Sequence, residues 1–195
     1  MLTLVLGGVR SGKSRFAQQL ASSAARVAYV ATSQPGQDPE MIARIQMHSA
    51  NRPSSWRTIE EPLALACTVE NAASQADVIL VECLTVWLSN VFWEYRDRTS
   101  QHVEDHVRVQ LGRIGAASSH CRVILVSNEL GSGTVPEAAI TRAFRDTHGL
   151  LNQWAAAVAD EVILTVAGLP LYLKTASRRS GTDLPLENQS RTGLD

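Results

Sequence analysis

The sequence predicts an α/β fold in which a mostly parallel central sheet has helices on both faces, within a single domain. Three observations lead to this prediction. Short, almost continuously apolar runs alternate with longer helical segments along the chain, and strands that are covered on both faces have that pattern. The length of 195 residues is usual for one domain, and the hydrophobic fraction of 45% is ordinary for a protein with a sizeable core. No internal repeat or interdomain linker interrupts the pattern.

Five apolar runs are predicted to be strands, and one shorter segment is predicted to be extended. The strands comprise residues 2–6, 26–31, 78–82, 122–127 and 162–166, and the short segment comprises residues 56–60. Helices are predicted at residues 14–25, 39–49, 62–74, 84–93, 103–119 and 137–159, the last with a break at Gly149. The second helix has a defined start, because Asp38 can cap it, Pro39 fits its first position and Glu40 lies near the positive end of its dipole.

The domain is predicted to span residues 1–174. From about Thr175 onward the chain becomes polar. A segment with so few apolar residues cannot bury enough surface to fold by itself. We therefore expect residues 175–195 to form a disordered or loosely attached C-terminal tail.

Charge and cysteine content exclude several classes of protein. The net charge of −1 argues against general nucleic-acid binding, which requires a basic surface. Three widely spaced cysteines, Cys67, Cys83 and Cys121, indicate reduced thiols in the cytosol and not a disulfide framework or zinc site. The N-terminus lacks the charged region of a signal peptide, and no apolar run approaches the roughly 18–20 residues that span a bilayer. We expect a soluble, cytoplasmic protein with no membrane span.

A glycine-rich segment lies between the first predicted strand and the first predicted helix. Its eight residues match the P-loop pattern G-x-x-x-x-G-K-[S/T] and comprise Gly7, Gly8, Val9, Arg10, Ser11, Gly12, Lys13 and Ser14. Glycines allow a tight turn whose N–H groups point at phosphate oxygens, and the helix N-terminus adds a partial positive charge. Lys13 is expected to reach the β- and γ-phosphates, and the Ser14 hydroxyl to bind Mg²⁺. A turn that only joins strand to helix is the simpler interpretation, but one of only two lysines among the 18 Lys and Arg residues lies here.

Other polar residues lie where the predicted strands end. Glu82 ends the third strand and is expected to organise Mg²⁺ beside the P-loop, although a carboxylate at a strand end can also be ordinary. Glu60 and Glu61 are equally consistent with binding a metal or a ribose hydroxyl and with solvent exposure. The segments 31–34 and 128–134 follow two further strands. Since ligands of open parallel sheets bind at the carboxyl ends of the strands, these residues are expected to converge on one edge with the P-loop.

Among the histidines, His48 has the most suggestive surroundings. Arg44 precedes it by four residues on the same predicted helix face, and Arg52 follows it. A basic environment keeps an imidazole neutral, and a neutral imidazole nitrogen can attack phosphorus. From spacing alone, however, a lone helix histidine is more often an ordinary surface residue. The other histidines lack such a context, and the pair with metal-ligand spacing has no third ligand and is assigned to a solvated helix face: His102 and His106 form that pair, and His120 and His148 are the others.

Several segments together carry a family resemblance that extends from about Leu2 to Lys174. They are GGVRSGKS (7–14), YVATSQ (29–34), MIARIQMHSANRPSSWRTIEEP (41–62), VILVECLTVWLSN (78–90), SNELGSGTVPE (127–137), FRDTHGLLNQ (144–153), ADEVILTVAGLP (159–170) and Lys174. On these motifs the chain resembles the bifunctional adenosylcobinamide kinase / adenosylcobinamide-phosphate guanylyltransferases of cobalamin biosynthesis. The combination H-x-x-x-R-P-x-x-W after A-R-I is far more specific than a P-loop alone.

The resemblance implies a fold, an activity and a site. The fold is a RecA-like P-loop NTPase assembled as a homotrimer with its active site at a subunit interface. The activity is phosphorylation of adenosylcobinamide with ATP or GTP, followed by transfer of GMP from GTP through a GMP–histidine intermediate at His48, with release of pyrophosphate. Lys13 and His48 are the implied catalytic residues, and Ser14 and Glu82 the implied Mg²⁺ ligands. Nucleotide binding is assigned to residues 7–14 and to Ala31, Thr32, Ser33, Ser49, Ala50, Asn51, Arg52, Glu60 and Glu82.

Two departures from the family pattern affect these assignments. Met47 replaces a second histidine that some relatives carry, so His48 is the only candidate nucleophile. Glu82 stands where many relatives have aspartate, which leaves direct contact with Mg²⁺ open. Two other functions also stay open: a P-loop small-molecule kinase in which His48 is structural, and a nucleotide-switched binding protein.

Overall fold

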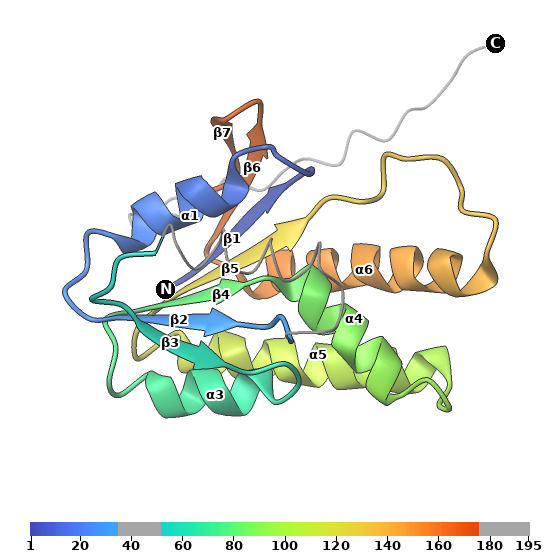
Figure 1. Ribbon diagram of the computed structural model, residues 1–195, viewed down its shortest axis with the longest axis horizontal. Helices are drawn as coiled ribbons and strands as arrows, with labels where there is room; N and C mark the ends of the chain where they lie inside the picture. Colours follow the sequence, from blue (N-terminus) through green and yellow to red (C-terminus); the bar gives the residue numbers. More distant parts are fainter. Residues whose placement is uncertain (35–51, 176–195) are drawn as a thin grey trace, which may run out of the picture.

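A computed structural model describes residues 1–34 and 52–175 (Figure 1). Its centre is a sheet with the strand order β3-β2-β4-β5-β1-β6-β7. The strands are β1 Leu2–Gly7, β2 Val27–Ala31, β3 Arg57–Glu60, β4 Val78–Glu82, β5 Arg122–Asn128, β6 Glu161–Val166 and β7 Leu169–Lys174. All neighbouring pairs are parallel except β6 and β7. The predicted mostly parallel α/β fold is therefore confirmed.

The helices agree with the predicted ones, with two informative differences. They are α1 Lys13–Ala21, α3 Leu65–Ala72, α4 Leu84–Glu94, α5 Ser100–Ala117 and α6 Ala139–Val158. Helix α1 ends four residues early, where the hydroxyls of Ser22 and Ser23 donate to carbonyls of its last turn. The break predicted at Gly149 is wrong, because α6 continues through it. One glycine costs a helix about 1 kcal/mol, and the burial of Leu151 and Ala155 offsets that cost. The helix predicted at 39–49 lies outside the described residues.

The two faces of the sheet are covered unequally (Figure 1). Among the described elements, α1 packs on one face, where alternate strand residues such as Tyr29, Leu80 and Ile124 meet its Ala17. Helices α3 to α6 cover the other face and enclose a larger core around Trp87. Side chains alternate between the two faces along each strand. Because both faces are covered, consecutive residues of a strand are apolar, which gives the continuous apolar runs of the sequence. The P-loop leads into α1 and therefore lies at the face of the sheet that has the thinner helical cover.

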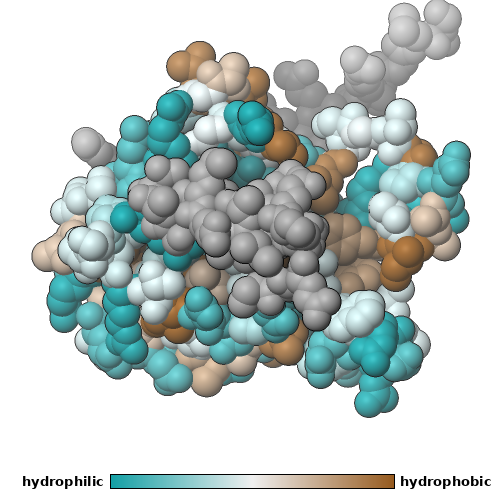
Figure 2. All heavy atoms as spheres, in the orientation of Figure 1, coloured by the Kyte–Doolittle hydropathy of each residue, from teal (hydrophilic) through white to brown (hydrophobic). Residues whose placement is uncertain are grey.

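The β6–β7 hairpin extends the sheet beyond what the sequence predicted. Ala167 and Gly168 turn the chain with φ values of 51° and 82°. The residues of β7 are exposed, and apolar side chains gather at the hairpin in Figure 2. Pro170 cannot donate to a sheet ladder and is tolerated because β7 is an edge strand. The end of β7 is anchored by Lys174, whose ammonium donates to the carbonyls of Ala156, Ala157 and Ala159 at the end of α6.

None of the described helices is long and apolar enough to cross a membrane. Cys67, Cys83 and Cys121 are free thiols.

Candidate nucleotide site

The P-loop joins β1 to α1 in a conformation that requires its glycines. Gly12 has φ 96° and precedes the first turn of α1, and Ser11 N–H donates to Gly8 O at 3.3 Å. A Cβ on Gly12 would lie 3.1 Å from the Cα of Gly168. A Cβ on Gly7 would overlap the side-chain oxygens of Ser11 and Thr165. Only glycine fits these two positions, so the pattern has a structural as well as a chemical cause.

Hydrogen bonds hold the base of the P-loop, and its other side is exposed. Ser11 Oγ lies 2.9 Å from Thr165 Oγ1, which donates to Leu6 O at 3.0 Å. Gly168 N–H donates to Ser11 O at 2.8 Å, so the β6–β7 turn also supports the loop. Above this base Val9 is 76% exposed, Arg10 is exposed, and Gly8 is half-buried. The Ser11 side chain thus supports the base of the P-loop, and the backbone of the loop lines the exposed side.

Lys13 and Ser14 begin α1 at the open side of the loop. The Lys13 ammonium donates to Gly8 O at 3.2 Å. Burial lowers the pKa of Lys13 from its usual value, whereas Cys83 and Glu82 act to raise it. The Ser14 side chain is half-buried. An ammonium that has lost part of its hydration regains favourable contacts from the oxygens of a phosphate that binds at the helix N-terminus.

Glu82 ends β4 on the face that carries α1. Tyr29 Oη donates to Glu82 Oε2 at 3.3 Å, and burial is the main cause that raises the pKa of this tyrosine. Beside them, Thr32 Oγ1 donates to Cys83 O and accepts from Cys83 N–H, both at 2.9 Å. Asn90 donates to Thr32 O at 2.8 Å. Thr32 is 0% exposed, so its hydroxyl joins the end of β2 to the start of α4.

Arg52 lies on the other side of Tyr29. Its guanidinium carbon is 3.7 Å from the centroid of the tyrosine ring, a cation–π contact. The Nε of Arg52 is buried and has no hydrogen-bond partner among residues 1–34 and 52–175. Tyr29 therefore links two predicted site residues, Glu82 and Arg52. The predicted residues His48, Ser49, Ala50 and Asn51 lie outside the described residues.

The paired glutamates have different environments. Glu61 Oε1 accepts from the N–H groups of Leu63 and Ala64 at 2.8 and 2.7 Å, so it holds the turn before α3. Glu60 is exposed at the end of β3. Both Glu60 and Glu82 pair with Ala31 of the intervening β2, which separates them by two strand spacings, about 10 Å. Of the predicted edge residues, Ala31 is the last residue of β2 and is buried, and Ser33 follows two residues later and is half-buried.

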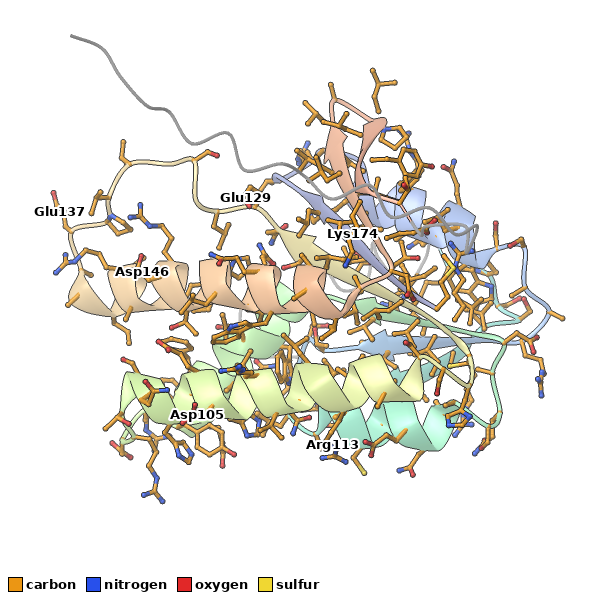
Figure 3. All side chains as sticks on the ribbon, turned by 180° about the vertical axis from the view of Figure 1, so that it is seen from behind. Asp105, Arg113, Glu129, Glu137, Asp146 and Lys174 are labelled. Atoms are coloured by element: carbon orange, nitrogen blue, oxygen red, sulfur yellow. The ribbon has the colours of Figure 1, made fainter. Side chains whose placement is uncertain are left out.

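The segment after β5 also reaches the P-loop. Glu129 N–H donates to Gly7 O at 3.0 Å, and Figure 3 shows Glu129 where β5 ends. Sequence reasoning missed His148 behind this point, where it is 1% exposed and lies 2.9 Å from Thr85 Oγ1. Burial lowers its pKa to about 4. A polar residue within the apolar face of α6 was the one available signal.

The two histidines of α5 have different surroundings. His102 is exposed, but His106 is half-buried, with its ring 5.0 Å from Tyr95 and 6.4 Å from Trp87. The prediction of a solvated helix face is therefore wrong for His106, because Trp87 of α4 and Tyr95 just after α4 pack near its ring. No group of three metal-ligating side chains is present in residues 1–34 and 52–175.

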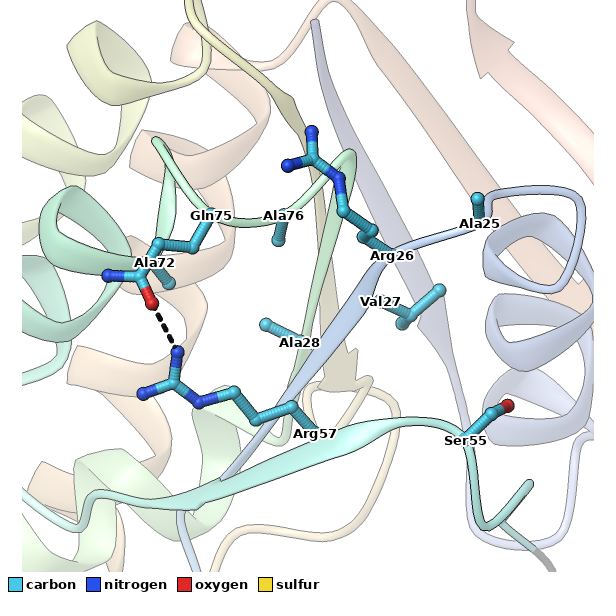
Figure 4. A pocket seen from close by; sticks show the side chains of 9 residues that line it. All are labelled: Ala25, Arg26, Val27, Ala28, Ser55, Arg57, Ala72, Gln75 and Ala76. Atoms are coloured by element: carbon cyan, nitrogen blue, oxygen red, sulfur yellow. Dashed lines mark hydrogen bonds between the residues drawn. The ribbon is translucent and has the colours of Figure 1, made fainter.

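A separate pocket of about 240 Å³ lies at the opposite end of β2 and β3 (Figure 4). Arg57 donates to Gln75 Oε1 at 2.6 Å inside it, and Arg26 at its rim pairs with Asp77. Its arginines already have partners, and the P-loop lies at the other edge of the sheet. This pocket is therefore not part of the nucleotide site. Its lining residues are Ala25, Arg26, Val27, Ala28, Ser55, Arg57, Ala72, Gln75 and Ala76.

Solved structures are similar to the chain in fold. A prototypical ATPase from a bacterial type III secretion system superposes with a TM-score of 0.56 at 12% identity, over 84% of this chain and 50% of the ATPase chain. The chain thus spans half the length of that ATPase. A protein of Pyrococcus horikoshii OT3 superposes with a TM-score of 0.54 at 8% identity, over 91% of this chain and 87% of the other. The overall α/β fold is therefore shared.

Sequence comparison is more specific. The family model described as cobinamide kinase / cobinamide phosphate guanyltransferase matches residues 3–173. The bifunctional adenosylcobalamin biosynthesis protein CobP of Pseudomonas aeruginosa is 45% identical over 175 residues, which is 89% of this chain and 98% of that protein. The bifunctional adenosylcobalamin biosynthesis protein CobU of Escherichia coli is 40% identical, over 89% of this chain and 100% of that protein. The chain therefore belongs to the cobinamide kinase / cobinamide phosphate guanyltransferase family.

Proposed function

We propose that the chain is a bifunctional enzyme that phosphorylates adenosylcobinamide with ATP or GTP and then transfers GMP from GTP to the resulting phosphate. The products of the second step are adenosylcobinamide-GDP and pyrophosphate. The observation that carries this proposal is the open P-loop, with Lys13 and Glu82 on the same face of the sheet. Family membership supplies the substrate class, since the matched relatives are named as bifunctional proteins of adenosylcobalamin biosynthesis.

The kinase step follows from the loop's shape and charge. The backbone N–H groups of residues 8–14 and the N-terminus of α1 would hold the β- and γ-phosphates, with Lys13 beside them. The substrate hydroxyl attacks the γ-phosphorus while the bond to the bridging oxygen breaks, and the hydroxyl proton leaves to solvent or a base. Positioning and charge stabilisation suffice for such a transfer.

Ser14 and Glu82 would hold Mg²⁺. A hydroxyl and a carboxylate are hard oxygen ligands, which this ion prefers. Both side chains are half-buried at the open side of the loop. Tyr29 donates to Oε2 of Glu82, and this hydrogen bond orients the carboxylate. When bound, the ion would neutralise charge on the phosphates.

GMP transfer would use His48 as the nucleophile. An imidazole nitrogen attacks the α-phosphorus, the bond from that phosphorus to the β-phosphate bridging oxygen breaks, and pyrophosphate leaves. A phosphate oxygen of the corrinoid substrate then attacks the same phosphorus and releases the histidine. The P-loop amides and Lys13 would stabilise the leaving pyrophosphate. The remaining nucleotide contacts are proposed for Ala31, Thr32, Ser33, residues 49–52 and Glu60.

We further propose a cytoplasmic homotrimer whose enzymatic domain is residues 1–174. Its exposed β6–β7 hairpin, with Leu169 71% and Leu171 55% exposed, is compatible with contact between subunits. Mass measurement in solution by light scattering tests the trimer directly. A monomer would contradict it.

Incubation with α-labelled GTP and Mg²⁺ tests the transfer step. Label should stay on the protein, labile to acid and stable to base, as a phosphoramidate is. The His48→Ala variant should retain no label and should still phosphorylate adenosylcobinamide. If the wild-type protein phosphorylates the corrinoid but is never labelled, the chain is a small-molecule kinase only. If it hydrolyses GTP slowly and phosphorylates nothing, the result favours the hypothesis that the chain is a nucleotide-switched binding protein.

A further inference from the structure

A buried polar network lies behind the end of β5, on the face opposite α1. It joins Thr85 of α4, Ser127 of β5, and His148 and Asn152 of α6. His148 is 1% exposed, Ser127 0% and Asn152 7%. Polar groups this deep are costly unless each is hydrogen-bonded. These four side chains bond to one another and to the backbone beside them.

The network forms hydrogen bonds to the backbone of one residue, Asn128. Thr85 Oγ1 accepts from the N–H of Asn128 at 3.0 Å and is itself 2.9 Å from His148 Nε2. Asn152 donates to the carbonyl of Asn128 at 2.9 Å, and its own oxygen accepts from Ser127 Oγ at 2.7 Å. Both polar groups of the Asn128 main chain are thus bonded to side chains.

Asn128 is the last residue of β5 and lies beside the P-loop. It is in register with Gly7, and the next residue, Glu129, donates its N–H to Gly7 O at 3.0 Å. Side chains alternate along the strand: Val126 packs toward α1 and Ser127 toward the network. The Asn128 side chain therefore lies on the α1 face, the face of Lys13 and Glu82.

We propose that His148 is a positioning residue for phosphoryl and nucleotidyl transfer. Through Thr85 it fixes the Ser127–Asn128 peptide, the one before the peptide that bonds to Gly7, and so aligns Gly7 and the Asn128 side chain with the bound phosphates. It does not touch the nucleotide. This inference rests on the proposed function, because it needs a triphosphate on the P-loop. The ring stays neutral in this setting, since burial lowers its pKa to about 4.

The test compares His148→Leu, which removes the bond, with His148→Gln, whose amide can replace it. Thr85→Val removes the same bond from the other side. Gln110→Met is the matched control, because Gln110 is likewise buried, at 9% exposed, and accepts from a main-chain N–H, that of Ala66 at 2.9 Å, but in the α3–α5 packing. For each variant, kcat and KM of corrinoid phosphorylation and of GMP transfer are measured, together with stability in urea.

His148→Leu should lower kcat on the order of 10- to 100-fold, as small misplacements of reacting groups do, with KM for GTP changed less than about threefold. His148→Gln should recover most of the loss. Thr85→Val should match His148→Leu, and the double variant should be no slower than the slower single one. Gln110→Met should lose stability and keep its kcat.

Equal kcat values for His148→Leu and Gln110→Met at comparable stability would overturn the inference. If the leucine variant does not fold, an unchanged kcat in Thr85→Val would overturn it as well. Failure of the proposed function looks different, because the wild-type protein itself would then not phosphorylate adenosylcobinamide.

Discussion

The two edges of the sheet differ in how their charged groups are bonded. At the amino ends of the strands, Arg26 pairs with Asp77 at 2.6 Å and Arg122 with Glu161 at 4.0 Å. At the carboxyl ends, neither Lys13 nor Glu82 forms an ion pair with any residue in 1–34 or 52–175. A charge that folding leaves without a counter-charge can still interact with a ligand. The carboxyl edge is thus adapted to binding and the amino edge to closing the fold.

Replacing Lys13 by alanine should have the largest effect. It removes the partly buried ammonium at the start of α1, so both kcat values should fall on the order of 10³-fold. Lys174→Ala is the matched control, since that ammonium caps α6 and should affect stability but not kcat. Initial rates of both reactions check this. Kinase activity near the wild-type level in Lys13→Ala would contradict the proposal that one P-loop serves both steps.

Glu82→Gln should rank second. The amide keeps the shape but loses the charge, so both rates should fall on the order of 10²-fold, and the Mg²⁺ concentration for half-maximal rate should rise. Tyr29→Phe removes only the hydroxyl that orients Glu82 and should cost less. Magnesium titrations of the two variants check the order. An unchanged magnesium requirement in Glu82→Gln would exclude it as a ligand.

The His148 network should make stability depend on pH. The pKa of His148 is about 4 in the folded protein and about 6.5 in an unfolded chain. The unfolded state therefore binds the extra proton first, so the contribution is fully present above about pH 6.5 and is lost as pH falls toward 4. The slope is at most about 1.4 kcal/mol per pH unit.

Urea unfolding at pH 7 and pH 5 measures this dependence. His148→Leu should lose less stability than the wild-type protein between these two values. Glu129 acts to raise the pKa of His148, and His106 has a lowered pKa of its own, so the difference between the two proteins is the informative quantity. Parallel curves would contradict a buried neutral His148.

The sequence predicted the central parallel strands β1, β2, β4 and β5 because each is buried on both faces, which gives an apolar run with no competing pattern. It did not predict β7, because Pro170 lies within the apolar residues of this segment and disfavours a strand anywhere but at a sheet edge. The P-loop was predictable because its residues are contiguous. The His148 network was not, because its partners Thr85, Ser127 and Asn152 are single polar residues that only packing brings together. The role of His48 stays a prediction.

Asp77→Asn should have the smallest effect and tests the other side of the comparison. Asp77 accepts from the backbone and guanidinium of Arg26, and these bonds lower its pKa. The pair is exposed, with 62% and 41% of the side chains accessible, and exposed pairs contribute little to stability. Both kcat values should stay within about twofold and the melting temperature within about two degrees. A large loss of activity would mean that the amino edge also shapes the site, and that paired charges alone do not separate the two edges.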